Sequence, residues 1–255
     1  MQSSSESQTA GEGDSPSLSD AVLRPSVLVR GHHAFESCVG RLATAIRLGL
    51  YPEGSTLPPE RELAEKLDVS RPTVREAITA LRTAGFVHTT RGRGGGTVIN
   101  HHLVQHGQGV LQDLADHPDD LFESLDFRRV VEPGACHHAA SRELTDVQVK
   151  LLRESLAAVT DAPDSTTYRK ADSRLHLAIA SVTDSRRMID AVTQVQADLH
   201  DMLTAIPVLN TNIEHSDHQH RAIVEAILAG EAYQARLAME RHCDDTAALL
   251  RGLLS

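Results

Sequence analysis

The chain has 255 residues, of which 40% are hydrophobic and 24% charged, so it is not disordered throughout and has room for two domains of ordinary size. Aromatic residues make up only 3% and Trp is absent, which argues against an all-β fold. The net charge of −10 conceals an asymmetry, because residues 27–99 hold ten Lys or Arg against seven Asp or Glu, whereas residues 100–255 hold fourteen against twenty-four. Only the former segment has the positive balance that a nucleic acid requires.

Residues 1–26 are rich in Ser, Gly, Glu and Asp and hold too little apolar surface to offset the entropy of ordering, so we expect a flexible tail. They also lack the hydrophobic stretch of a signal peptide. No apolar run in the chain approaches the ~18 residues that a membrane-spanning helix needs. We therefore expect a cytoplasmic protein without membrane contact.

The positively charged segment contains three predicted helices. Apolar residues recur at helical spacing over Ala34–Leu50, and a short helix follows over Glu60–Leu67. Ser70 is a good N-cap for a third helix over Arg71–Ala84, where Pro72 is tolerated because N–H groups of the first turn have no intrahelical acceptor. A short helix, a tight turn and a second helix are the elements of a helix-turn-helix.

Two short strands are predicted next, near Phe86–Thr90 and Thr97–Ile99. Between them lies the run Arg-Gly-Arg-Gly-Gly-Gly, whose glycines permit a tight turn and whose arginines make its tip cationic. A basic hairpin after a helix-turn-helix is a wing. We therefore predict that residues 27–99 form a winged helix-turn-helix domain.

The start of the third helix carries the predicted base contacts. Arg71 and Arg75 lie four residues apart and so on one helical face, with Thr73 beside them. Their guanidinium groups can each form paired hydrogen bonds to guanine O6 and N7, and the helix N-terminus favours a phosphate. Any one arginine alone would be an ordinary surface charge, but the group favours DNA recognition. Further DNA contacts are expected from Arg61, Arg91 and Gly92.

Residues 100–117 are rich in His, Gln and Gly, and we interpret them as a linker. Helical periodicity then continues to the end of the chain, with Pro133, Pro163 and Pro207 as expected breaks or starts. We predict that residues 118–255 form an all-α antiparallel bundle of six or seven helices. The fold as a whole is then mainly α.

The bundle contains a candidate metal site. Asp172 and His176, at positions i and i+4, lie on one helical face. His220 and His242 each lie on the apolar face of another predicted helix, and burying such groups is costly unless each is hydrogen-bonded or bound to a metal. One Asp and three His suit a divalent transition metal, zinc first and nickel or manganese as alternatives. Any one histidine alone could instead be a hydrogen-bonded core residue, and His218 is an alternative to His220.

The run LPPERELAEKLDVSRPTVREAITALRTAGFVHTTRGRGGGTVI resembles the DNA-binding domain of the GntR family of bacterial transcription regulators, and the resemblance covers nearly all of residues 34–99. The family pattern leads from "SERELA" to "VSRxTVREAL" and then to a glycine-rich wing. The chain has Pro59 where Ser is usual, which leaves the assignment intact. The resemblance implies DNA contacts at Arg61, Ser70, Arg71, Thr73, Arg75, Arg91 and Gly92.

Three later runs, LFESLDFRRVVEPGACHHAA, DSRLHLAIA and HRAIVEAILAGEAYQARLAMERHCDD, resemble the FCD domain, the ligand-binding half of the FadR-like branch of that family. Members of this branch that bind a metal hold it with one Asp and three His, and their effectors are usually small organic or sugar acids bound beside the metal. The chain departs from the pattern at Leu175 and Ser185, so its effector contacts can differ. The resemblance places the metal ligands at Asp172, His176, His220 and His242.

An arginine near the start of the bundle is a candidate effector contact. The guanidinium of Arg128, or that of Arg129, matches the geometry of a carboxylate. The equally favoured alternative is an ion pair of either arginine with Glu132 on the same helix.

These features together predict a DNA-binding transcription regulator, a repressor rather than an activator, that binds a palindromic operator as a homodimer. A small carboxylate would complete the coordination of the metal and change the separation of the two winged helices. One alternative is a metal-free, acyl-CoA-type sensor. Another is a metal-dependent enzyme with a DNA-binding appendage, although the bundle offers no convincing general base; we expect no enzymatic activity.

Overall fold

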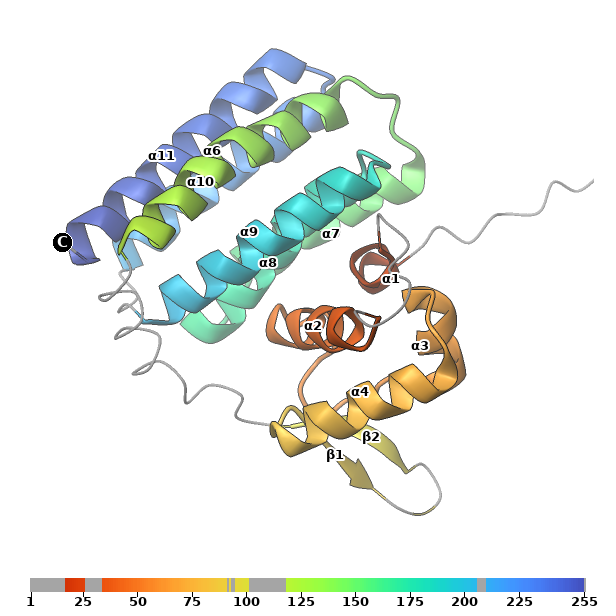
Figure 1. Ribbon diagram of the computed structural model, residues 1–255. Helices are drawn as coiled ribbons and strands as arrows, with labels where there is room; N and C mark the ends of the chain where they lie inside the picture. Colours follow the sequence, from red (N-terminus) through yellow and green to blue (C-terminus); the bar gives the residue numbers. More distant parts are fainter. Residues whose placement is uncertain are drawn as a thin grey trace, which may run out of the picture.

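A computed structural model describes residues 17–25, 34–90, 92, 95–100, 118–205 and 210–254. It contains a small N-terminal body of helices with one β-hairpin and a larger helical bundle (Figure 1). Nearly all of the predicted linker, 100–117, lies outside the described residues, as do Arg91 and Pro207. Within the described ranges, no helix is both long and apolar enough to cross a membrane.

The N-terminal body is a winged helix-turn-helix, as predicted. Its helices are α2 (Ala34–Arg47), α3 (Glu60–Leu67) and α4 (Arg71–Thr83), and its wing consists of β1 (Val87–Thr90) and β2 (Gly96–Ile99). The two strands are antiparallel. The apolar faces of all five elements meet in one core, which includes Leu42, Leu63, Val74, Leu81, Val87 and Ile99.

The segment before α3 adds a further pairing to the wing. Thr56 forms a β-bridge with Val98 of β2, and the N–H of Leu57 donates to the carbonyl of Thr97. A Cβ on Gly96 would lie only 2.6 Å from the side chain of Thr56. Gly96 is therefore required by this close approach, in addition to the turn chemistry expected from the sequence.

The second body is an all-α bundle of six helices in the part of the chain that the structure describes, in agreement with the predicted six or seven. They are α6 (Pro118–Ala140), α7 (Asp146–Thr160), α8 (Ser165–Ser181), α9 (Arg186–Ala205), α10 (Asn210–Leu228) and α11 (Ala232–Leu254). Thr145 caps α7 with a capping box, and Asp164 caps α8. Pro163 lies between these two helices, where a break was expected.

Pro133 is an exception, because it lies inside α6 rather than at an end, so the predicted break there is wrong. A proline inside a helix removes one backbone hydrogen bond and costs roughly 3 kcal/mol. The helix nevertheless continues for 23 residues because it packs against α8, α9, α10 and α11 along its length. Tertiary burial of α6 outweighs the local preference of one residue.

The predicted flexible tail is also wrong over part of its length. Leu18–Leu23 form a short helix, α1, which begins at a capping box made by Ser17 and Asp20. Val22 packs with residues of α8 and α9, whereas Leu23 is part of the core of the winged helix-turn-helix. The polar composition of residues 1–26 concealed this short apolar segment, whose order depends on contacts made by both bodies.

Polar contacts hold α1 at the junction of the two bodies, where Figure 1 shows it between the bundle and the winged helix-turn-helix. Arg41 of α2 donates to the carbonyl of Val22 at 3.0 Å and pairs with Asp190 of α9 at 3.1 Å. Lys66 of α3 pairs with Asp20 of α1 at 2.6 Å. The helix α1 thus contacts elements of both bodies.

Replacing Leu23 with Ala tests whether α1 is part of the folded protein. Leu23 is fully buried, so Leu23→Ala should lower the free energy of unfolding by about 2 kcal/mol in urea titrations. Leu18→Ala, on the same helix but only partly buried, is the control and should have a smaller effect. Wild-type stability of Leu23→Ala would contradict the docking of α1.

Candidate metal centre and nucleic-acid interface

The first turn of α4 is built as the sequence predicts. The hydroxyl of Ser70 accepts a hydrogen bond from the backbone N–H of Thr73 at 3.2 Å, which caps the helix. Val74 faces the core, whereas Arg71 and Arg75 are exposed on the outer side. Ser70, Arg71, Thr73 and Arg75 therefore lie together at the exposed N-terminal end of α4.

Arg75 has a partner that sequence reasoning missed. Its guanidinium pairs with both carboxylate oxygens of Glu60 in α3, at 2.8 and 3.2 Å. The hydrogen bond from Arg75 lowers the pKa of Glu60 below its usual value. An exposed pair of this kind contributes little to stability, so Arg75 can leave Glu60 for a base edge at small cost. Arg61, the next residue along α3, is exposed as well.

The wing supplies the remaining part of this surface. Gly92 is exposed and has a φ of 107°, a conformation that favours glycine. Arg82 of α4 donates to the hydroxyl of Thr89 in β1 at 3.3 Å, which ties the wing to the end of α4. Because Arg91 lies outside the described residues, its predicted contact stays a prediction.

The four predicted metal ligands converge in the bundle. Asp172 and His176 come from α8, His220 from α10 and His242 from α11. Each residue offers one ligand atom, and these atoms all lie within 4.8 Å of one another. All four residues are buried, whereas the alternative ligand His218 is exposed. The cluster can therefore hold a metal ion.

The hydrogen bonding of the cluster fits this role. Neither ring nitrogen of His176 or His220 has a hydrogen-bond partner, although all four atoms are buried. The Nε2 of His220 lies 3.1 Å from Asp172, but this contact lacks hydrogen-bond geometry. Buried nitrogens without hydrogen bonds are costly, and a cation would satisfy their lone pairs. Carboxylates come near only one ring nitrogen of each histidine, and the Nε2 of His176 and the Nδ1 of His220 are buried without a hydrogen-bond partner.

The pKa values of His242 and Asp172 suit metal binding. Burial lowers the pKa of His242 well below its usual value, and the charges of neighbouring His220 and Arg128 add to this effect. The Nδ1 of His242 lies 3.1 Å from the side-chain carbonyl of Gln219, which fixes the tautomer and leaves Nε2 as the free lone pair. Burial by itself raises the pKa of Asp172. His220, His176 and Arg128 lower it by more than burial raises it, so the pKa falls to about 2. His242 thus offers a neutral imidazole and Asp172 an ionised carboxylate.

Glu132 is a central residue whose place in this cluster the sequence did not reveal. It accepts hydrogen bonds from the Nε of Arg128 at 2.9 Å and from the amide of Gln196, and it lies 3.0 Å from the Nδ1 of His176. Burial raises the pKa of Glu132, but Arg128 and His176 lower it to well below its usual value. The i,i+4 spacing of Arg128 and Glu132 was the available signal, whereas nothing local indicated Gln196.

The two candidate effector arginines have different surroundings. Arg128 is buried against Glu132, which is the ion pair that the sequence allowed as an alternative. Arg129 instead pairs with Glu240 and Asp244 of α11. The ion pair with Glu132 involves only the Nε of Arg128, and the Nη1 and Nη2 atoms are buried without a hydrogen-bond partner. These N–H groups are available to an anion that enters the bundle.

Each of the two bodies matches a known protein family or domain. Residues 36–98 match the bacterial regulatory proteins of the gntR family, and residues 123–245 match the FCD domain. The chain is 35% identical over 202 residues to the putative L-lactate dehydrogenase operon regulatory protein of Escherichia coli (strain K12), covering 74% of this chain and 75% of that protein. It is 27% identical to the HTH-type transcriptional regulator LutR of Bacillus subtilis (strain 168), covering 81% and 96%.

A solved structure supports the fold alone. Escherichia coli McbR/YncC superposes with a TM-score of 0.53 at 18% identity, covering 89% of this chain and all of that one. Together the winged helix-turn-helix, the helical domain behind it and the relatives define a bacterial transcription regulator with an effector-binding domain, and not an enzyme. The chain belongs to the GntR family and carries an FCD domain.

Replacing Arg71 or Arg75 with Ala tests the recognition surface. Each substitution should weaken binding to the specific operator by about 1–3 kcal/mol, measured by fluorescence anisotropy at fixed salt, because a bidentate base contact is lost. Both side chains are exposed, so the fold should survive. Arg153→Ala, an exposed position on α7, is the control. Undiminished affinity in both α4 variants would contradict the assignment.

Replacing His220 with Ala tests the metal centre. The variant loses one of four ligands, so elemental analysis of the purified protein should show that the bound metal is lost. His218→Ala is the matched control, since this histidine lies on the same helix two residues away and is exposed; it should retain the metal. Full occupancy in His220→Ala would mean that another residue is the ligand.

Proposed function

We propose that this regulator represses transcription in the cytoplasm as a homodimer on a palindromic operator, and that a small carboxylate bound beside a metal ion controls its hold on DNA. The observation that carries the proposal is that two kinds of buried nitrogen atoms without hydrogen-bond partners lie in the same region of the bundle. The imidazole nitrogens of His176 and His220 lack hydrogen bonds, and so do two guanidinium nitrogens of Arg128. A cation would bind the lone pairs of the imidazole nitrogens, and an anion would accept hydrogen bonds from the guanidinium nitrogens.

The residues that would hold the ion are Asp172, His176, His220 and His242. Zinc is the first candidate, with nickel or manganese as alternatives, because three imidazoles and a carboxylate suit all of them. When bound with open positions, such an ion supplies a Lewis-acidic site for the oxygen atoms of an acid. The unsatisfied nitrogens favour this arrangement over a metal-free, acyl-CoA-type sensor.

Arg128 is the proposed anchor for the carboxylate of the effector. Its Nε is held by Glu132, so the guanidinium is oriented before the ligand arrives. Its charge also reaches the metal ligands, because it lowers the pKa of both Asp172 and His242. Glu132 contacts both the Nε of Arg128, at 2.9 Å, and the Nδ1 of His176, at 3.0 Å, so one small molecule could contact both Arg128 and the cluster.

The relatives suggest which acids to test first. By its name, the Escherichia coli relative at 35% identity regulates the operon of an L-lactate dehydrogenase, an enzyme of a 2-hydroxy acid. A 2-hydroxy acid carries a carboxylate for Arg128 and a neighbouring hydroxyl as a second oxygen donor. We propose small organic or sugar acids of this kind as the effector class. Leu175 and Ser185, the departures from the family pattern, are a core residue and the N-terminal cap of α9.

The route from the effector to DNA runs through α8 and α1. The helix α8 carries Asp172 and His176. Leu177, the residue after His176, and Ala180, one turn after it, pack with α1 in a shared cluster. The helix α1 in turn packs against α2 and α3 of the winged helix-turn-helix. A small shift of α8 would alter the separation of the two winged helices. Misregister that costs ~1 kcal/mol per half-site weakens operator binding several-fold.

A thermal-shift screen of small carboxylates, with and without a chelator, tests the effector site. The right acid at 100 times its Kd should stabilise the protein by about 2.7 kcal/mol, and the chelator should abolish this shift. Arg128→Lys keeps the charge that balances Glu132 but loses the guanidinium fork, so it should lose most of the shift. The matched control Arg129→Lys should keep it. Stabilisation that needs neither metal nor Arg128 would place the effector elsewhere.

A further inference from the structure

A hollow lies where α1 docks against the bundle. It has a volume of about 160 Å³ and is enclosed by α1, α7, the end of α8 and the start of α9. Its apolar lining consists of Ala21, Val147, Leu151, Val182 and Ile189. It shares no lining residue with the metal cluster or with the proposed effector anchor in α6. We call this cavity the α1 hollow.

One charged group in this lining lacks a partner. Arg186, the first residue of α9, has an Nη1 that is buried without a hydrogen-bond partner among the residues that the structure describes. The acidic residue of the lining, Asp184, does not compensate it, because its carboxylate accepts from Arg142 and from the amide of Gln148. A buried guanidinium nitrogen without a partner is costly, so an anion that contacts Arg186 is favoured.

The surroundings of Arg186 are positively charged. Burial lowers the pKa of Arg186, and the charges of Arg24 and Arg41 lower it further. Asp190 raises this pKa, but its carboxylate is already paired with Arg41 at 3.1 Å. In the described part of this junction, three guanidinium groups thus lie near one carboxylate. The resulting surplus of positive charge attracts an anion.

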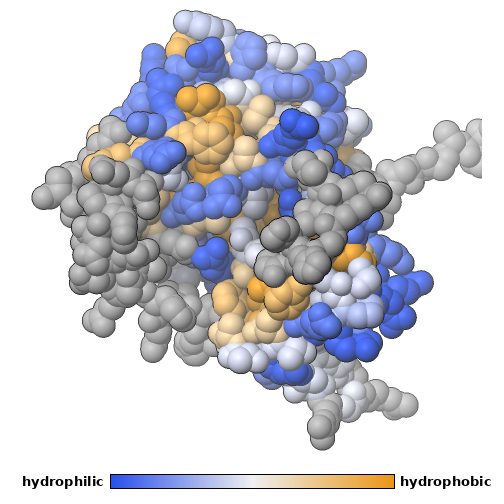
Figure 2. Space-filling model, in the orientation of Figure 1, coloured by the Kyte–Doolittle hydropathy of each residue, from blue (hydrophilic) through white to orange (hydrophobic). Residues whose placement is uncertain are grey.

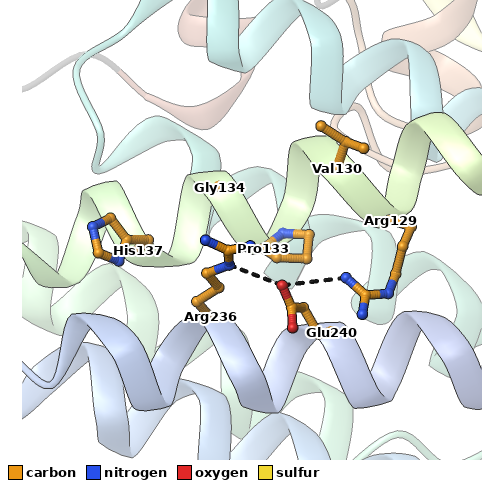
Figure 3. Close-up of a pocket in the computed structure, with 7 residues that line it drawn as sticks. All are labelled: Arg129, Val130, Pro133, Gly134, His137, Arg236 and Glu240. Carbon is orange, nitrogen blue, oxygen red and sulfur yellow. Dashed lines mark hydrogen bonds and ion pairs between the residues drawn. The ribbon is translucent and has the colours of Figure 1, made fainter.

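The hollow between α6 and α11 shows the contrast (Figure 3). Its volume is about 350 Å³, but its charges satisfy one another, because Glu240 pairs with both Arg236 and Arg129, at 2.8 and 3.2 Å. Apolar surface borders it, since Val130 is 73% exposed and Figure 2 shows apolar residues gathered on the bundle face where α6 lies. The guanidinium groups of that hollow therefore do not require an anion, whereas Arg186 does.

We propose that the α1 hollow is a second ligand site, which binds a short aliphatic carboxylate without a metal. The carboxylate lies against the guanidinium of Arg186, whose fork matches its geometry. The aliphatic chain packs on Val147, Leu151 and Ile189. A cavity of about 150 Å³ takes up benzene, so an acid of about four or five carbons has the right size. The site does not depend on the metal cluster of the proposed function.

A ligand in the α1 hollow acts on the docking of α1. Ala21 lines the hollow, whereas the next two residues, Val22 and Leu23, pack with the bundle and with the winged helix-turn-helix. A ligand that contacts Ala21 gains this contact only while α1 is docked, so its binding favours the docked state. The hollow is therefore placed to adjust the contact between the two bodies separately from the metal cluster.

Isothermal titration of the full chain with pentanoate tests the site. Pentanoate should bind the metal-loaded protein and keep its affinity when a chelator removes the metal, and it should bind His220→Ala as well. Pentanamide has the same shape but no charge, so it should bind about ten-fold more weakly. Binding that requires the metal or His220 would place the acid in the cluster, and equal binding of pentanamide would exclude recognition by Arg186. Either result overturns the inference.

Variants of the lining test the role of its residues. Arg186→Gln should weaken pentanoate binding about ten-fold, whereas Arg187→Gln, at the exposed neighbouring position, should leave it unchanged. Val147 is 56% exposed, so Val147→Glu should fold and should repel the acid. Its uncharged match, Val147→Gln, should still bind pentanoate. Wild-type affinity in both Arg186→Gln and Val147→Glu would show that the acid does not occupy the hollow.

Hydrogen exchange locates the ligand directly. Pentanoate should slow the exchange of amides in Leu18–Leu23 and at the start of α9, and it should leave α10 and α11 unchanged. Slower exchange in α10 and α11 alone would place the acid at the metal cluster and overturn the inference. If the wild-type chain binds no pentanoate, the second site is wrong, whereas the metal-dependent effector of the proposed function is still decided by its own screen.

Discussion

The balance of charge inside the bundle is the constraint on which the rest of the structure depends. Six ionisable groups meet there: one guanidinium, two carboxylates and three imidazoles. A metal binds imidazole only in its neutral form, so in the metal-binding state these groups sum to one negative charge, in a setting where uncompensated charge is costly. A divalent cation would reverse the sign to a single positive charge, which a small monocarboxylate would neutralise. On the proposed function, the cation would therefore bind first and the carboxylate second.

The sequence pattern correctly predicted those features that depend only on residues near one another in the chain. The bounds of α3 and the cap at Ser70 follow from spacing and capping chemistry, and the inward faces of His176 and His220 follow from helical periodicity. Helical periodicity does not show that the histidines lie close together, because residues on the inward faces of three different helices need not be in contact. The contact of Glu132 with Gln196 joins α6 to α9 across 64 residues, and no local signal encodes such a pairing.

The errors of prediction have one physical cause. At Pro133 a residue that breaks isolated helices is held in α6 by its neighbours, and at Leu18–Leu23 an apolar segment too short to fold alone is held by contacts from two bodies. In both places tertiary contacts decide the conformation against the local preference. The second exception lies at a place that the proposed function uses, because α1 contacts both bodies.

The position of α1 has a consequence for how the two halves of the protein influence one another. Both bodies have cores of their own, so each can fold when α1 is missing. A chain trimmed to begin at Ala34 would lose this shared element and keep only the direct contacts between the bodies, such as the pair of Arg41 with Asp190, so the proposed coupling of effector binding to DNA binding would weaken. The six residues of α1 would thus strengthen the mechanical link between the two bodies without being part of either binding surface.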